Sequence, residues 1–86
     1  MSDQIPRELG LLSGSTWARH TTARQVELVA DTGAIPATVV VQTLAAGMAG
    51  RLAEYDADGE SEFWAGFVQG VKATFVESLQ ARSKQN

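Results

Sequence analysis

The residues best suited to chemistry are the acidic side chains of segment 54–62, which places five carboxylates within nine residues. Calcium prefers carboxylate oxygens, and an EF-hand loop supplies them at alternate positions around a glycine at position 6. Aligned on that loop, Asp56, Asp58 and Gly59 match positions 3, 5 and 6. Position 12 is Ala65, where a bidentate glutamate should complete the coordination sphere. We therefore expect an acidic turn between two helices, and no metal or other cofactor.

The acidic turn has two interpretations. Crowded like charges repel one another, so their cost favours a role in contact with a partner. Asp56, Asp58 and Glu60 would then face a basic partner surface and steer association. Alternatively the turn is simply solvated, and Glu60 and Glu62 stabilise the positive N-terminal end of the following helix. The sequence leaves both interpretations open.

His20 is the only histidine, so a multi-histidine metal site is excluded. A serine–histidine–acid triad could in principle use Ser13 or Ser15, but no Gly-x-Ser-x-Gly elbow marks a nucleophile. The chain also lacks a Walker loop and a dinucleotide-binding fingerprint. We therefore expect a non-enzymatic protein with no small-molecule substrate, and a surface histidine near a helix start.

Composition narrows the function further. The chain has 86 residues, enough for one domain, and no cysteine for a disulfide or a thiolate metal site. Its formal charge of −3 and lack of Lys/Arg clusters argue against nucleic-acid binding. Gln42, Thr43 and Arg51 interrupt the apolar stretches, so no membrane span is expected. The N-terminus has no signal-peptide pattern, and we expect a cytoplasmic location.

Three segments are predicted along the chain. Pro6, Gly10 and Gly14 interrupt the first part, so residues 1–15 are predicted to form a flexible N-terminal arm. Residues 16–82 form a single helical domain, and residues 83–86 form a frayed tail.

The first predicted helix runs from Ala23 to Thr32. Thr22 and Gln25 have the spacing of a capping box, in which the two side chains satisfy free amides of the first turn. Gly33 is then a natural helix terminator. The helix could begin earlier, near Ser15, and a strand over His20–Val29 is the alternative, because the helical periodicity is poor there.

The second predicted helix runs from Pro36 to Tyr55. Its β-branched start could form a strand in isolation, but apolar residues then recur at spacings of four and three, the helical period. The row comprises Val40, Leu44, Met48, Leu52 and Tyr55.

The third predicted helix runs from Glu60 to Arg82 and carries apolar residues around a wider arc than one core requires. Its row comprises Phe63, Phe67, Val71, Phe75 and Leu79. Gly66 and Gly70 lie one turn apart, and because helix glycines are costly, the pair indicates that another backbone approaches closely. The fold prediction is therefore an all-α protein of three helices, the last two an antiparallel hairpin completed into a bundle by dimerisation.

The surplus apolar surface predicts an interface with a second copy or another protein. The predicted interface residues are Phe63, Trp64, Phe67, Gly66, Gly70, Val71, Phe75, Leu44 and Met48. Trp17 is a further predicted partner contact, because tryptophan is enriched at binding hot spots. The expected function is that of a small acidic regulator, adaptor or inhibitor that covers a surface of a larger protein.

Two other functions remain open. Segment 25–44 has a weak helix-turn-helix pattern, although no Lys or Arg lies between Arg24 and Arg51. A dimeric DNA-binding regulator would have to contact phosphates through Arg7, Arg19 and Arg24. The other alternative is a small structural subunit of an assembly.

Overall fold

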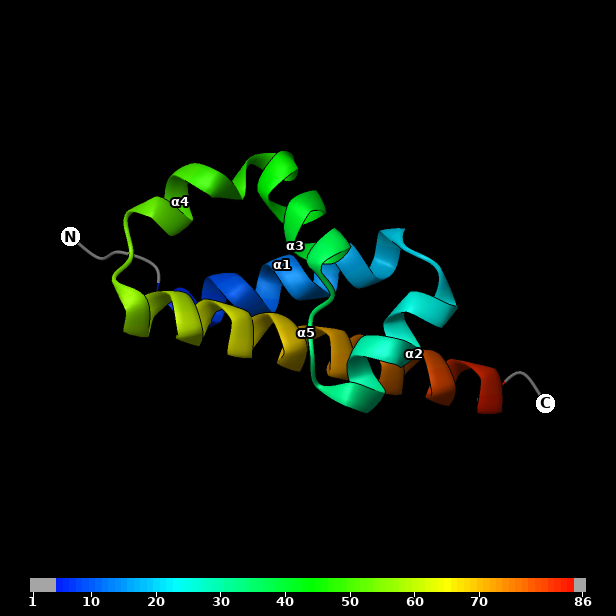
Figure 1. Ribbon diagram of the computed structural model, residues 1–86. Coiled ribbons are helices and arrows are strands. Elements are labelled where there is room, and N and C mark those ends of the chain that lie inside the picture. The colour runs from blue at the N-terminus through cyan, green and yellow to red at the C-terminus, as the bar shows by residue number, and fades with distance from the viewer. Residues whose placement is uncertain (1–4, 85–86) are drawn as a thin grey trace.

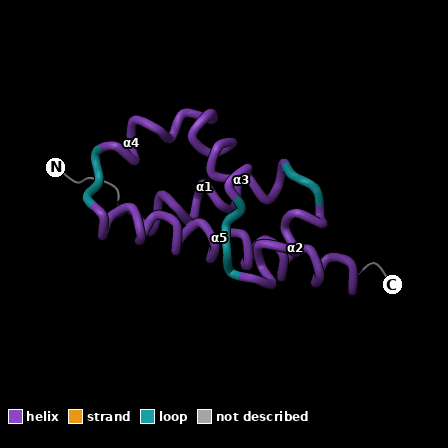
Figure 2. Tube along the Cα trace, in the orientation of Figure 1, coloured by secondary structure: helices purple, strands orange, loops and turns teal. Residues whose placement is uncertain are grey.

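The computed structural model describes the backbone of residues 5–84 and the side chains of residues 5–81. This part of the chain is helical and contains no strand, as the all-α prediction requires. Short loops join the helices (Figure 2). The molecule measures 46 × 28 × 20 Å. The elements in order are α1 (Pro6–His20), α2 (Ala23–Thr32), α3 (Ala37–Thr43), the π-helical segment η1 (Leu44–Met48), α4 (Ala49–Ala53) and α5 (Ala57–Lys84).

Helix α1 replaces most of the predicted flexible arm, so that prediction is wrong for the described part of residues 1–15. Pro6 begins the helix, where its missing N–H has no helical partner in any case. Gly10 and Gly14, which resemble helix breakers, are buried in the helix–helix contact. Residues 1–4 lie outside the described part. At the other end α5 continues through Lys84, and the rest of the predicted tail lies outside the described residues.

Helices α1 and α5 pack side by side and run in the same direction. A Cβ placed on Gly10 would overlap the carbonyl oxygen of Phe63, and one on Gly14 would overlap that of Phe67. A step of four residues along α1, from Gly10 to Gly14, matches a step of four in the same direction along α5, from Phe63 to Phe67, so the two helices are parallel. Only glycine permits this approach of one backbone to the other.

The glycines of α5 make the reciprocal contact. A Cβ on Gly66 would overlap the carbonyl oxygen of Arg7, and one on Gly70 would overlap that of Leu11. The interpretation that another backbone lies against Gly66 and Gly70 is therefore confirmed. That backbone belongs to α1 of the same chain, not to a second copy.

Helix α2 has the predicted bounds. The Thr22 hydroxyl accepts a hydrogen bond from the Gln25 N–H at 3.3 Å, which caps the first turn. Gly33 ends the helix with a left-handed φ of 70°, a conformation that glycine adopts at little cost. The strand alternative over residues 20–29 is wrong.

Residues 37–53, which comprise α3, η1 and α4, form an arch over one side of the α1–α5 pair (Figure 1). The predicted helix from Pro36 to Tyr55 is not continuous, because Gly47 has a φ of 106° that breaks it. Only Val39, Thr43 and Leu52 of the arch are buried. The predicted hairpin therefore does not pack along its length, and α1 is a helix that the prediction did not contain.

The core lies where α1, α2 and the arch meet α5. Phe63, Phe67 and Val71 of α5 are fully buried, together with Val29 of α2. Val39 brings the arch into the same core. The predicted α5 row is thus confirmed as the main apolar face of the helix, at least as far as Val71.

Candidate interaction surface

Five of the predicted interface residues lie inside the single chain. Phe63, Phe67 and Val71 have no exposed surface, and Gly66 and Gly70 pack against the backbone of α1. None of them can contact a partner in this structure, so this part of the interface prediction is corrected. The physical reason is that α1, expected to be an arm, covers the face of α5 that was assigned to a partner.

The other predicted interface residues keep some accessible surface. Trp64, Phe75 and Met48 are partly buried at the edge of the core, and Leu44 is 36% exposed. The Trp64 ring packs edge-on against Phe63, with ring centroids 4.9 Å apart. Trp64 is therefore held by the core on one side and accessible on the other.

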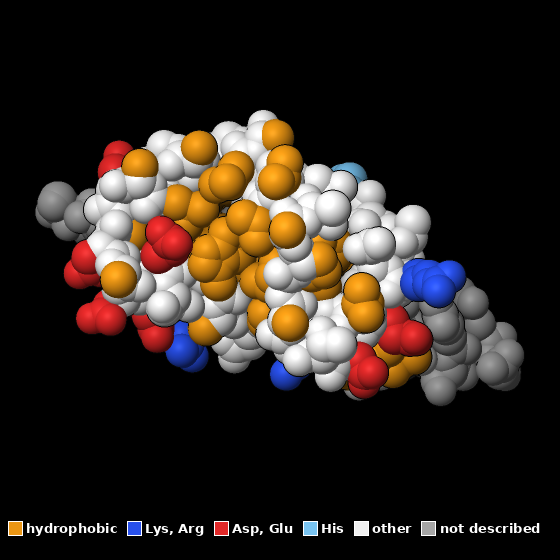
Figure 3. All heavy atoms as spheres, in the orientation of Figure 1, with side chains coloured by type: hydrophobic (Ala, Val, Ile, Leu, Met, Phe, Trp, Pro, Cys, Tyr) orange, Lys and Arg blue, Asp and Glu red, His pale blue; other side chains and the backbone are white. Residues whose placement is uncertain are grey.

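An apolar groove lies between α3 and α5, with a volume of about 560 Å³. Figure 3 shows hydrophobic side chains gathered between the arch and α5 on this face of the molecule. Val41, 63% exposed, belongs to the same helix as the groove residue Val40. We name this feature the α3–α5 groove; it is lined by Gly33, Ile35, Val40, Trp64, Ala65 and Val68.

The sequence interpretation missed most of this groove. Val40 belongs to the predicted row of the second helix and Trp64 to the predicted interface, but the rows do not show which members face a core and which face solvent. Ile35, next to Pro36, lies in a loop and belongs to no periodic row. The packing of α1 determines which residues of α5 are accessible. Helix α1 covers one face of α5 and leaves the edge that carries Trp64 and Val68 partly exposed.

The acidic turn is partly structural. Asp56 precedes α5, and its Oδ1 accepts a hydrogen bond from the Gly59 N–H at 2.8 Å, which caps the helix. Glu62 forms an exposed ion pair with Arg7 of α1, with Nε and Oε1 2.9 Å apart. Asp58 is exposed in the first turn of α5. Among the described residues, no group of three His, Cys, Asp or Glu side chains is placed to hold a metal ion.

His20 and Trp17 lie on the face of α1 below the arch. His20 Nδ1 contacts the Thr16 carbonyl at 2.8 Å, and Ser13 lies about 10 Å farther along the helix axis, out of direct reach. The Trp17 indole N–H donates to Gln42 Oε1 at 3.2 Å, which ties α1 to the arch. Trp17 is partly buried, and its ring centroid lies 5.8 Å from that of Phe67.

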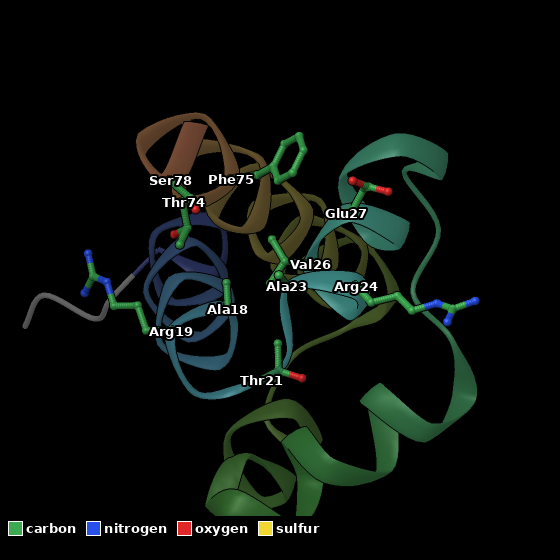
Figure 4. Close-up of a pocket in the computed structure, with 10 residues that line it drawn as sticks. All are labelled: Ala18, Arg19, Thr21, Ala23, Arg24, Val26, Glu27, Thr74, Phe75 and Ser78. Carbon is green, nitrogen blue, oxygen red and sulfur yellow. The ribbon is translucent and has the colours of Figure 1, made fainter. Parts of the chain in front are cut away.

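A second hollow of about 600 Å³ lies where the end of α1 meets α2 and α5. Its two arginines, Arg19 and Arg24, extend away from it toward opposite sides (Figure 4). Ala18 and Val26 contribute apolar surface. The cations therefore do not converge on a common point, and this hollow is not built as an anion site.

A scan against protein-family models finds no match, and searches of the curated proteins and of the solved structures find none either. Within the described residues, no single helix is long and apolar enough to cross a membrane; α2 and the arch pass that test only together, as a pair bent by 113°.

Proposed function

We propose that the protein is a non-enzymatic protein–protein interaction module whose principal contact surface is the α3–α5 groove. The observation that carries this proposal is a groove lined only by apolar side chains and glycine, with Trp64 at its wall. Exposed apolar patches of this kind are typical of binding surfaces. Partly buried tryptophans are frequent hot spots, because a rigid scaffold holds them ready for contact.

The proposed partners are a second copy of the chain and a larger protein that the module regulates. In a homodimer, the Trp64–Val68 edge of each copy would be buried against the other, which adds the burial that a small domain lacks. Asp58 and Glu60, exposed at the start of α5, would steer a basic partner toward this surface. Asp56 has a capping role in addition to any contact.

Light scattering on matched variants tests the self-association part. Val68→Glu adds a charge inside the groove, whereas Gln69→Glu adds the same charge at the next residue, which is exposed and does not line the groove. We expect the wild type and Gln69→Glu to give about twice the 9.2 kDa chain mass at micromolar concentration, and Val68→Glu to give a folded monomer. A wild type that stays monomeric, or two variants with the same mass in solution, would contradict self-association through the α3–α5 groove.

One observation favours a second function, a DNA-binding helix-turn-helix regulator. A four-residue loop, residues 33–36, joins α2 and the arch at 113°, within the range of that motif. Against it, α3 carries no Lys or Arg, so the second helix would have little attraction for phosphates. Fluorescence anisotropy with a random DNA duplex at physiological salt should show no binding. Submicromolar binding with a steep salt dependence would instead support the regulator.

A further inference from the structure

A further cavity, distinct from the α3–α5 groove and from the hollow at the end of α1, lies between α1 and the arch and has a volume of about 470 Å³. One face of α1 supplies residues from Leu9 to His20, which span about 16 Å along the helix axis. The arch supplies the opposite wall, including Gln42 and Met48. The size lies within the range of small-molecule pockets in proteins. We name it the α1 cavity.

The two ends of the α1 cavity differ in polarity. The arch runs back toward the start of α1 (Figure 1), so the later part of the arch lies toward the end of the cavity formed by Leu9 and Leu12. Gln42 is hydrogen-bonded to Trp17 and therefore lies toward the end formed by His20. Most of the wall is apolar, although the hydroxyl residues Ser13, Thr16 and Thr43 also line it. A long molecule bound here would therefore meet mainly apolar surface along its body, and the side chains of His20 and Gln42 at one tip.

The hydrogen bonds already made at the polar end determine what remains free. A carbonyl oxygen can only accept, so the contact to Thr16 places the His20 proton on Nδ1 and leaves Nε2 as an acceptor in the neutral ring. Gln42 Oε1 accepts from Trp17, which orients the amide and leaves its NH₂ group as a donor. One acceptor and one donor thus flank the same end of the cavity.

The charge around the cavity indicates the head group. No Asp, Glu, Lys or Arg residue lines the α1 cavity. The polar end also lies at the C-terminal end of α1, where the partial charge of the helix is negative and disfavours an anion. Arg19 lies in the same last turn, but it does not line the cavity. A hydroxyl group suits both free positions, because its O–H donates to His20 Nε2 while its oxygen accepts from Gln42. We propose that the α1 cavity binds an uncharged amphiphile, an aliphatic chain that ends in a hydroxyl group.

An NMR titration of the wild-type protein with 1-octanol, and separately with octanoate, tests the proposal. The indole N–H signal of Trp17 is the reporter, since that group lies at the polar end, and the indole signal of Trp64 is the internal reference. We expect a saturable shift of the Trp17 signal with 1-octanol and binding of octanoate that is weaker by about tenfold or more. Equal binding of the two compounds, or no saturable shift, would overturn the proposal.

Two arch variants locate the site. Ala46→Phe places a ring in the cavity, whereas Ala45→Phe adds the same ring at the preceding residue, which is exposed and does not line the cavity. We expect Ala46→Phe to abolish the 1-octanol response and Ala45→Phe to retain it. An unchanged response in folded Ala46→Phe would overturn the assignment.

Gln42→Met tests the polar end without filling the cavity. It preserves the length of the side chain and removes both the amide donor and the oxygen that accepts from the Trp17 indole N–H, so 1-octanol should bind about threefold to tenfold more weakly. If Ala46→Phe does not fold, Gln42→Met provides the test of the binding site. An unchanged affinity of Gln42→Met for 1-octanol would overturn the proposed role of Gln42.

Discussion

Four glycines bring the two long helices together. Gly10 and Gly14 of α1 face carbonyl groups of α5, and Gly66 and Gly70 of α5 face carbonyl groups of α1. At this separation, Cα–H groups of one backbone can contact oxygens of the other, which adds a small favourable term to the close packing. The absence of a side chain is therefore the specific contribution of these four residues.

The first prediction concerns Gly14 and uses Gly50 as its control. Gly14→Ala places a methyl group against the backbone of Phe67, which cannot move without separating the helices, so we expect a loss of at least about 2 kcal/mol in unfolding free energy. Gly50→Ala in α4 meets no atom within 4 Å and should stabilise the protein by about 0.5–1 kcal/mol. Urea unfolding followed by circular dichroism measures both. Two variants of equal stability would contradict the packing argument.

The sequence identified only half of this contact. Gly66 and Gly70 lie inside a strongly apolar helix, where glycine needs a reason, and close approach of a backbone was the correct one. Gly10 and Gly14 have the same spacing but lie among Ser, Pro and Leu residues, where glycine equally indicates a loop. Local composition does not distinguish a glycine in a loop from a glycine in a helix–helix contact. The packing of α1 against α5 makes that distinction.

Among the elements, those with clear end signals were predicted best. The cap at Thr22 and the terminator Gly33 fixed α2, and the apolar row from Phe63 located α5. The break at Gly47 was missed, because a glycine within an alanine-rich segment does not show whether its φ is positive. The groove depends on which helix covers α5, a tertiary fact that helical periodicity does not contain.

The second prediction concerns the arch as an element. Few of its side chains are buried, and a π-helical segment interrupts its hydrogen-bond pattern, so it should open locally at a lower free energy than α1 or α5. Hydrogen–deuterium exchange should show faster exchange at Ala45–Ala53 than at Gly66–Thr74 of α5. Equal protection of both segments under native conditions would show that the arch opens only with the whole molecule.

Across the whole molecule, the parallel arrangement of α1 and α5 places the N-terminal ends of both helices on one side. Their positive N-terminal ends lie together, where Glu8, Asp58 and Glu60 occupy the first turns. Arg19 and His20 lie in the last turn of α1, near its negative end. Side-by-side parallel dipoles repel each other, and the acids at one end compensate part of this cost. The acidic turn thus contributes to the fold, separately from any partner contact.

The third prediction tests this compensation at the scale of the molecule. The double variant Asp58→Asn/Glu60→Gln removes two charges from the first turn of α5, and we expect it to lose about 1 kcal/mol of unfolding free energy at low ionic strength. Glu27→Gln/Glu77→Gln removes the same net charge from exposed positions in α2 and late in α5, and it should change stability little.

Urea unfolding in salt provides a second test. The difference in stability between the two double variants should disappear in about 1 M salt, where charges are screened beyond about 3 Å. Equal losses in the two variants, or a loss that persists at high salt, would show that the acids do not act on the helix ends.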